Sequence, residues 1–394
     1  MMPSSTFDSN AIARTGFEAL HNGDARAARE AFERVIAAGR ADAAVHAALG
    51  YACARLDDNP AALAAADNAL ALDPRNLRAL IIKADGFAKM GDGRAAASFY
   101  RFALNIAPPP NQLPPDLRND LVRAEDMCAR YAGEFESFLR SRLAQHGLGD
   151  GRRVARFHHA IDILVGKKQI YFQQPQMFFF PELPQIQFYD REAFPWLDKV
   201  EAATADIRAE LVEVMREDSA FKPYVEHNPA RPRKEQAALT GNPDWSAFYL
   251  LKFSEIVTEN AARCPRTMRV MADVPLGGVK NRSPSVLFSL LRPGARIPPH
   301  SGLDNTRLIC HLPLLVPPGC GFRVGNDTRV PVEGKAWVFD DTIEHEAWNR
   351  SDRPRVILLF ETWRPELTDE ERALVAAMFN AIDEYSGEKL PWSV

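Results

Sequence analysis

The N-terminal third of the chain repeats with a period of 34 residues. Aligned in steps of 34 from Ser9, Ala43 and Leu77, the segments have small residues at the eighth and twentieth positions: Gly16, Gly50 and Ala84, then Ala28, Ala62 and Ala96. Small residues at such positions let two antiparallel helices approach closely. Pro74 and Pro108 then stand where the second helix of the later repeats must stop. The period therefore predicts three consecutive helical hairpins.

This pattern resembles tetratricopeptide (TPR) repeats over about residues 9–110. The first repeat departs from the pattern, with Arg40 where the others have proline. An Ala-rich helical bundle without repeats is the alternative. The resemblance implies a solenoid whose concave surface binds a peptide or partner protein. A further helix over about 116–145 is expected to cap the solenoid, which gives an all-α domain over residues 1–150.

The remaining residues, 151–394, have a different character. Residues 1–105 contain three of the chain's 29 prolines, so most prolines lie beyond them. A helix is predicted over about 198–217 from its apolar spacing. Short strand-like runs follow, separated by turn residues, which predicts an antiparallel barrel or a double-sheet jelly roll. The predicted strands are Val286–Leu291, Leu308–Leu315, Phe322–Val324, Ala336–Phe339 and Val356–Glu361.

Bulk composition excludes several classes of protein. A formal net charge of −4 gives no electrostatic footprint for nucleic acid. No run of 18 apolar residues exists to form a transmembrane segment, and residues 1–10 do not resemble a signal peptide. Five cysteines without CxxC spacing favour reduced thiols over a disulfide framework. We therefore expect a cytoplasmic protein.

Two histidines of the strand-rich region are candidate metal ligands. His300 follows two prolines, and His345 comes directly after a predicted strand. Two imidazoles with open positions beside them suit ferrous iron that must also bind a chelating cosubstrate and oxygen. Spacing alone leaves the two histidines unrelated as an alternative. A two-histidine, one-carboxylate site would also require Asp or Glu at the position of Gly302.

The region around these histidines resembles the aspartyl/asparaginyl β-hydroxylase family over about residues 175–368. The resemblance depends on a series of motifs in order: Ser289–Gly294, Pro299–Gly302, Asn305–Leu314, Phe339–Trp348 and Arg355. It implies an oxygenase dependent on Fe(II), 2-oxoglutarate and O2, built on a double-stranded β-helix (jelly-roll, cupin-like) with flanking helices. TPR repeats ahead of such a domain are also a family arrangement. The expected fold is thus an α+β multidomain chain.

The resemblance also implies roles for individual residues. His300 and His345 match the two iron ligands, and a glycine such as Gly302 is the family's own residue at the third position. Arg355 and Ser289 match the groups that bind the distal carboxylate of 2-oxoglutarate, and planar guanidinium suits a carboxylate. The other matches are His311, beside the chelating end of the cosubstrate, and Arg307, which faces the substrate.

Some positions depart from the family pattern or remain open. Ile309 and Leu287 stand where the family has basic residues toward the substrate, which weakens the case for an acidic substrate and leaves the cosubstrate site intact. Asp340 and Asp341 are either additional ligands or residues that cap the turn and orient His345.

The resemblance implies a hydroxylase of a protein or peptide side chain, with Asp or Asn hydroxylated at the β-carbon and the substrate recruited through the TPR surface. A hydroxylase of a small molecule, a free amino acid or a lipid acyl chain is the alternative. An alternative of another class is a TPR adaptor whose oxygenase domain is inactive.

Overall fold

The computed structural model describes residues 8–149, 151, 154–217, 220–225 and 241–386. The chain divides into two compact units, residues 1–168 and 169–394. The division follows Lys168, whereas the sequence indicated a boundary near residue 150. Helix α8 (Ala155–Leu164) thus belongs to the first unit, where an ion pair joins it to the preceding helix. In this pair Arg140 Nη2 lies 2.9 Å from Asp162 Oδ1.

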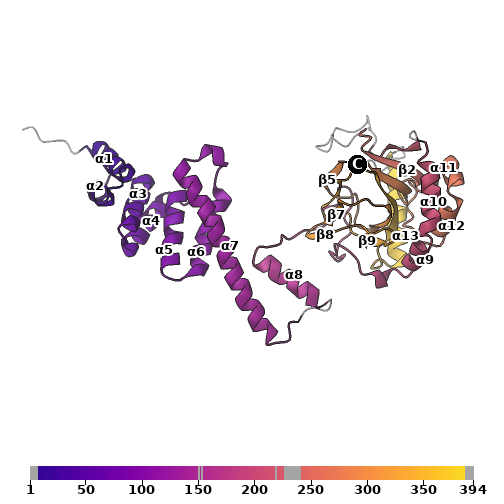
Figure 1. Cartoon of the computed structure of the whole chain (residues 1–394), viewed down its shortest axis with the longest axis horizontal. Coiled ribbons are helices and arrows are strands. Elements are labelled where there is room, and N and C mark those ends of the chain that lie inside the picture. Colours follow the sequence, from indigo (N-terminus) through magenta and orange to yellow (C-terminus); the bar gives the residue numbers. More distant parts are fainter. Residues whose placement is uncertain (1–7, 150, 152–153, 218–219, 226–240, 387–394) are drawn as a thin grey trace, which may run out of the picture. The chain divides into compact units, whose positions relative to one another are not determined.

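The first unit begins with three helical hairpins, which agree with the predicted 34-residue period (Figure 1). A long helix, α7 (Pro115–Ala144), follows the short 3-10 helix η1 (Pro110–Gln112) and shares an apolar core with the third hairpin, where the sequence predicted a capping helix. The hairpins are α1 (Ser9–His21) with α2 (Ala25–Ala37), α3 (Ala43–Arg55) with α4 (Asn59–Leu72), and α5 (Leu77–Lys89) with α6 (Gly93–Ile106).

The starts of these helices repeat with the same period. Each is preceded by an Asp or Asn whose side-chain oxygen accepts hydrogen bonds from backbone N–H groups of the first turn, which satisfies donors that the helix itself leaves unpaired. The capping residues form two series with a spacing of 34, namely Asp8, Asp42 and Asn76, then Asp24, Asp58 and Asp92.

Small residues lie where the paired helices come closest. Ala28 and Ala96 are fully buried, and Ala62 is 2% exposed. A Cβ placed on Gly50 would lie 3.2 Å from the backbone oxygen of Ala62, so the backbones of α3 and α4 approach closely at Gly50. The predicted reason for these residues, close helix approach, is therefore confirmed.

Replacing Ala62 by leucine should loosen the α3–α4 hairpin and lower its opening free energy by about 1–3 kcal/mol, because a larger side chain has no room there. Ala64→Leu, at an exposed position of the same helix, is the matched control and should change it by less than about 0.5 kcal/mol. Hydrogen–deuterium exchange of α3 and α4 in the intact chain measures the opening free energy of the hairpin in both variants. Equal protection in the two variants would contradict the role assigned to Ala62.

The second unit contains two antiparallel sheets. The larger sheet has the order β1-β2-β4-β11-β6-β9, with β3 also paired to β2, and the smaller has the order β5-β10-β7-β8. The strands are β1 (Lys222–Pro223), β2 (Trp245–Lys252), β3 (Glu255–Ile256), β4 (Val286–Leu291), β5 (Arg296–His300), β6 (Arg307–Leu315), β7 (Cys320–Val324), β8 (Asp327–Arg329), β9 (Trp337–Phe339), β10 (His345–Asn349) and β11 (Arg355–Trp363).

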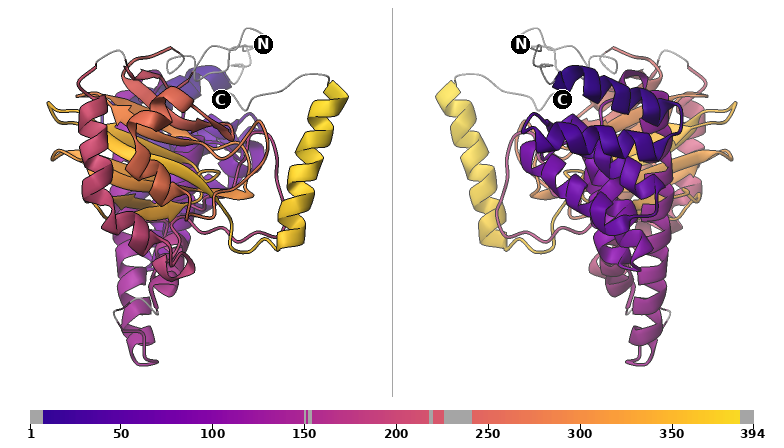
Figure 2. Two further views of the ribbon diagram at one scale, coloured as in Figure 1. Left: turned by 90° about the vertical axis from the view of Figure 1, so that its right-hand side faces the viewer. Right: turned by 90° about the vertical axis from the view of Figure 1, so that its left-hand side faces the viewer.

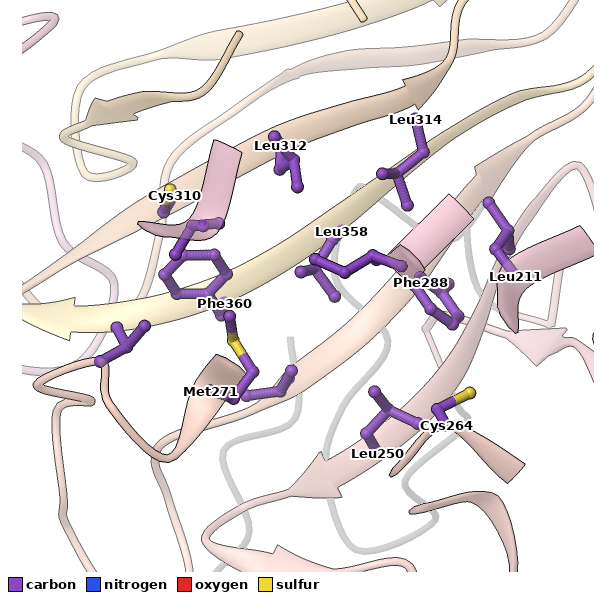
Figure 3. Packing of buried hydrophobic residues seen from close by; sticks show 14 of the residues in the cluster. Leu211, Leu250, Cys264, Met271, Phe288, Cys310, Leu312, Leu314, Leu358 and Phe360 are labelled. Carbon is purple, nitrogen blue, oxygen red and sulfur yellow. The ribbon is translucent and has the colours of Figure 1, made fainter. Parts of the chain in front are cut away.

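The two faces of the larger sheet have different partners, because successive side chains of a strand point to opposite faces. Even-numbered residues of β4, β6 and β11, such as Phe288, Leu312 and Leu358, pack against helices (Figure 3). Odd-numbered residues share a second core with β7 and β10 of the smaller sheet. The unit is thus layered as small sheet, large sheet and helices. The helices are α9 (Leu197–Ala202), α10 (Thr204–Val214), α11 (Thr258–Arg263) and α12 (Pro265–Met271).

Several details differ from the sequence expectation. The helix predicted over 198–217 is two helices, α9 and α10, separated at Ala203. The five predicted strands correspond to β4, β6, β7, β9 and β11, whereas β2, β5 and β10 were not predicted. A short 3-10 turn, η3 (Arg191–Ala193), precedes α9.

The C-terminal helix α13 (Asp369–Ser386) lies beside the sheets in Figure 2. Phe379 packs edge-to-face on Phe178 with ring centroids 5.4 Å apart, and a buried ion pair joins Asp383 to Arg282. Within the described residues, we find no helix with the length and apolar character needed to span a bilayer.

Candidate active site

The pairing of β5 with β10 places His300 directly opposite His345. Their ring centroids are 4.1 Å apart. The Nδ1 of His300 lies 2.8 Å from the carbonyl oxygen of Pro298, and the Nδ1 of His345 lies 3.1 Å from that of Ile343. Both distances assign the proton to Nδ1, which donates to the carbonyl. The Nε2 lone pair of each ring is therefore available to a metal.

Burial favours the neutral form of both imidazoles. It lowers the pKa of His300, and it lowers the pKa of His345 well below the usual value, with the charge of His300 acting in the same direction. A neutral imidazole is the form that binds a metal ion. The pair is therefore in the protonation state that a metal centre requires.

The carboxyl group of Asp341 occupies the space beside Gly302. A Cβ on Gly302 would lie 2.0 Å from Asp341 Oδ2, and the Gly302 N–H donates to the Asp341 carbonyl oxygen at 2.7 Å. Burial raises the pKa of the Asp341 carboxyl well above its usual value. Across the described part of the chain, no group of three or more His, Cys, Asp or Glu side chains is arranged to hold a metal ion. Two histidines with a nearby carboxyl are what this site offers.

Asp340 has a different place from its neighbour. Its Oδ1 accepts hydrogen bonds from the backbone N–H of Thr342 at 3.0 Å and from its hydroxyl at 2.6 Å. Its other oxygen accepts from Gln173 Nε2 at 2.8 Å and forms an ion pair with Arg364. Asp340 and Arg364 are both fully buried. Of the two alternatives for Asp340, the structure thus shows the turn cap, five residues before His345.

Arg355 is a buried cation, and no carboxylate of the described residues pairs with it. The residue is 1% exposed, and its Nε and Nη2 atoms have no hydrogen-bond partner within the residues that the structure describes. Burial lowers the pKa of its guanidinium to about 10. An unpaired buried charge is costly unless something compensates it. The position is therefore suited to an anionic ligand.

Ser289 lies on the neighbouring strand, in the register that brings it beside Arg355. Ser289 is opposite Ile357, and Leu291 is opposite Arg355. The side chains of Ser289 and Arg355 therefore share the inward face of the larger sheet, on adjacent strands and offset by two residues. The Ser289 oxygen accepts a hydrogen bond from Trp245 Nε1 at 3.1 Å. This bond leaves the hydroxyl proton free to be donated to a ligand.

His311 occupies the same inward face, on β6 opposite Leu359. It is 5% exposed, and its Nδ1 has no partner among the described residues. Its ring lies 4.8 Å from Phe339, which in turn lies 5.6 Å from His345. Burial lowers the pKa of His311 well below its usual value, and the charges of Arg355 and His345 add to this effect. The charges of His345 and of Arg355 therefore both influence the protonation of His311.

Arg307 is also on the inward face, but it is already paired. Its guanidinium contacts two carboxylates: Nη2 lies 2.6 Å from Asp304 Oδ2, and Nη1 lies 2.5 Å from Glu361 Oε1. Arg307 and Asp304 are 6% and 1% exposed. The structure thus places this predicted substrate residue near the site and gives it two internal partners.

Sequence reasoning missed three residues of the site. Trp245 binds Ser289, Glu361 neutralises Arg307, and Trp337, opposite His311 in the β6–β9 pair, has a buried Nε1 with no partner in the described residues. All three have odd numbers, like the site residues on their neighbouring strands. That alternation becomes informative only when the register between strands is known.

Comparison with known proteins identifies this region. Residues 201–365 match the family described as aspartyl/asparaginyl β-hydroxylase. This part of the chain belongs to that family. Human aspartate β-hydroxylase domain-containing protein 2 is 30% identical over 210 residues, which are 52% of this chain and 55% of that protein.

Two other members of the same group differ in the activity that their names state. The ornithine lipid ester-linked acyl 2-hydroxylase of Rhizobium tropici is 33% identical over 180 residues, covering 45% of this chain and 60% of that protein. Human aspartyl/asparaginyl β-hydroxylase is 35% identical over 146 residues, covering 36% and 19%. The chain spans about half the length of the first curated relatives that it matches.

Solved structures also resemble the first unit. The Arabidopsis OM64 TPR domain has a TM-score of 0.26 and 18% identity, and covers 30% of this chain and 94% of that one. The TPR2B domain of yeast Sti1 has a TM-score of 0.27 and 22% identity, and covers 30% and 96%.

Replacing Asp340 by asparagine should lower the unfolding free energy of the second unit by about 3–5 kcal/mol, because Arg364 would remain buried without its counter-charge. The neighbouring substitution Asp341→Asn is the control and should cause no loss, since Asp341 lies outside this ion pair. All six tryptophans lie in the second unit, so tryptophan fluorescence during urea unfolding reports on it. A similar loss of unfolding free energy in both variants would refute the assignment of Asp340, and not Asp341, as the counter-charge of Arg364.

Proposed function

We propose that this chain is an Fe(II)- and 2-oxoglutarate-dependent dioxygenase that hydroxylates a carbon of its substrate. The observation that supports this best is the opposed pair His300 and His345, whose Nδ1 atoms donate to backbone carbonyls, together with the buried Arg355 guanidinium, which has no counter-ion among the described residues. The two antiparallel sheets around a shared core support the double-stranded β-helix, or jelly-roll, interpretation of the fold.

The side chains present in the site are suitable ligands for both iron and 2-oxoglutarate. His300 and His345 would hold the iron through Nε2, with room left because Gly302 contributes no ligand. Arg355 and Ser289 would hold the distal carboxylate of 2-oxoglutarate, for which a guanidinium and a hydroxyl are suitable donors. His311 would lie beside the chelating end. When bound, iron and 2-oxoglutarate supply the oxidation by O2 that converts a C–H bond to C–OH.

The chain itself contributes positioning and exclusion of water. The Nδ1 hydrogen bonds to backbone carbonyls fix the orientation of both imidazoles. The Asp340 turn fixes the approach to His345, and it is in turn held by buried Arg364. Apolar residues of both sheets surround the site, which keeps the polar groups in a low-dielectric environment.

Two substrate classes fall within this proposal. The sequence favours a protein or peptide side chain, with Asp or Asn hydroxylated at the β-carbon. The alternative class comprises small molecules, free amino acids and acyl chains, and similarity to the Rhizobium acyl 2-hydroxylase favours the acyl chain. An adaptor with an inactive oxygenase domain would not need Arg355 to remain buried and unpaired.

We also propose that the helical hairpins bind a peptide partner or substrate. Exposed aromatic residues, Phe17 and Tyr51, occupy equivalent positions in the first helices of repeats one and two. Four residues later, each of the three repeats has an exposed basic residue: His21, Arg55 and Lys89. A row of aromatic and basic side chains suits a peptide with apolar and acidic residues. A cytoplasmic location belongs to the proposal as well, and the five free cysteines support it.

The metal site predicts a spectroscopic result. Under anaerobic conditions, wild-type protein with Fe(II) and 2-oxoglutarate should develop the visible charge-transfer band of a chelated keto acid, and His345→Ala should lose it. Absence of the band in the wild type, together with absence of succinate formation, would leave the adaptor hypothesis standing.

The cosubstrate site predicts a binding result. Arg355→Met should weaken 2-oxoglutarate binding at least about 100-fold, since a charge-assisted bidentate contact would be lost. Arg353→Met, an exposed arginine two residues earlier, is the matched control and should leave the dissociation constant unchanged. Titration of the charge-transfer band measures both, and equal affinities in the two variants would contradict the assignment.

A further inference from the structure

The cluster around Arg307 lies at the opposite end of the inward face from the proposed 2-oxoglutarate anchor. On β11, Arg355 begins the strand and Glu361 lies six residues later, which corresponds to roughly 20 Å along a strand. Glu361 and Arg307 then mark the far end of neighbouring strands β11 and β6. The Arg307 cluster and the proposed 2-oxoglutarate anchor therefore lie at opposite ends of this face.

Among the residues that the structure describes, the charged groups of this cluster sum to a neutral or negative charge. Arg307 is one cation, and it contacts the two carboxylates Asp304 and Glu361, so the formal charge of the three is −1. Burial raises the pKa of Glu361, and protonation there would bring the cluster only to neutrality. Asp341 adjoins the cluster, because the charges of Arg307 and Glu361 both act on its carboxyl. A substrate carboxylate would thus enter beside carboxyl groups.

Apolar side chains lie next to this cluster on the inward face of the larger sheet. Leu287, Ile309 and Leu359 lie on adjacent strands β4, β6 and β11, and they are 0%, 9% and 8% exposed. The β4–β11 register places Leu287 directly opposite Leu359. Hydrocarbon gains favourable burial against such a surface, whereas an unpaired charge would lose its hydration there.

We propose that this site accepts an uncharged hydrocarbon group of the substrate and rejects a carboxylate, because Arg307 is neutralised by Asp304 and Glu361 and the neighbouring side chains of the inward face are apolar. The inference rests on the proposed hydroxylase function and narrows its substrate class to methylene carbons such as those of an acyl chain. Arg307 is then a positioning residue that fixes Asp304 and Glu361 and does not bind the substrate.

The test compares probes that differ only in charge. At pH 7.5, octanamide and octanoate present the same hydrocarbon, and an Asn-containing and an Asp-containing peptide of otherwise equal sequence present the same side-chain shape. Binding to the metal-free intact chain is followed by tryptophan fluorescence in excess 2-oxoglutarate, which occupies the Arg355 anchor so that octanoate cannot bind there; Trp245 and Trp337 belong to the site. We expect octanamide to bind at least about tenfold more tightly than octanoate, because like charges placed together are unfavourable, and more tightly than either peptide.

Two variants test the assigned cause. Glu361→Gln keeps the side-chain shape and removes one negative charge, so it should reduce the preference for octanamide over octanoate several-fold. Glu333→Gln, which removes the surface partner of Arg208, is the matched control and should leave that preference unchanged. Thermal unfolding followed by the same fluorescence shows whether both variants remain folded.

Activity gives a second, independent readout. With Fe(II) and 2-oxoglutarate present, octanamide should stimulate succinate formation more than octanoate or either peptide. Tighter binding or faster turnover of octanoate or of a peptide would overturn the inference, as would an unchanged preference in Glu361→Gln. Failure of the proposed function is distinguishable, because it would remove the keto-acid band and succinate formation while the metal-free binding ratio would still be measurable.

Discussion

The alternation of side chains along β11 is the constraint on which the second unit depends. β11 pairs with β4 on one side and β6 on the other, so its register fixes which residues of three strands face inward. Even-numbered residues such as Leu358 form the layer against the helices, and odd-numbered residues form the site. A shift by one residue would place Arg355 among apolar helix contacts and expose the core side chains to the site. Fold and chemistry are therefore set by the same pairing.

Local patterns in the sequence predicted much of the architecture. The 34-residue period corresponds to hairpins whose helix starts and buried alanines repeat with it, because each repeat makes similar contacts with its neighbour. Strands rich in Val, Leu and Phe were also recognised. β5 was missed because Pro298 and Pro299 suggest a loop, although proline is compatible with a strand edge. β10 was missed because its residues are mostly polar, and it is pairing on both sides that makes it a strand.

The candidate site was less accessible to local reasoning. His300 and His345 were first singled out as candidate metal ligands by residue type and position, whereas Ser289, His311 and Arg355 were named from the family resemblance. The structure brings their strands together, and their roles remain predictions. The partners of Arg307 could not be found in this way, since Asp304 is three residues away but Glu361 is on another strand. The difference between adjacent aspartates also depends on tertiary contacts: Arg364 binds the first and Gly302 makes room for the second.

The contact between Gly302 and Asp341 makes two distant positions interchangeable as the source of a carboxyl group beside the histidines. One carboxyl fits in that space, and it comes from the segment before β10, not from the segment after β5. Any side chain added at residue 302 must displace Asp341. A change toward a site with two histidines and one directly placed carboxylate would therefore require paired substitutions, with an acid gained at 302 and lost at 341. Each substitution alone would leave the pocket overfilled or without a carboxyl group.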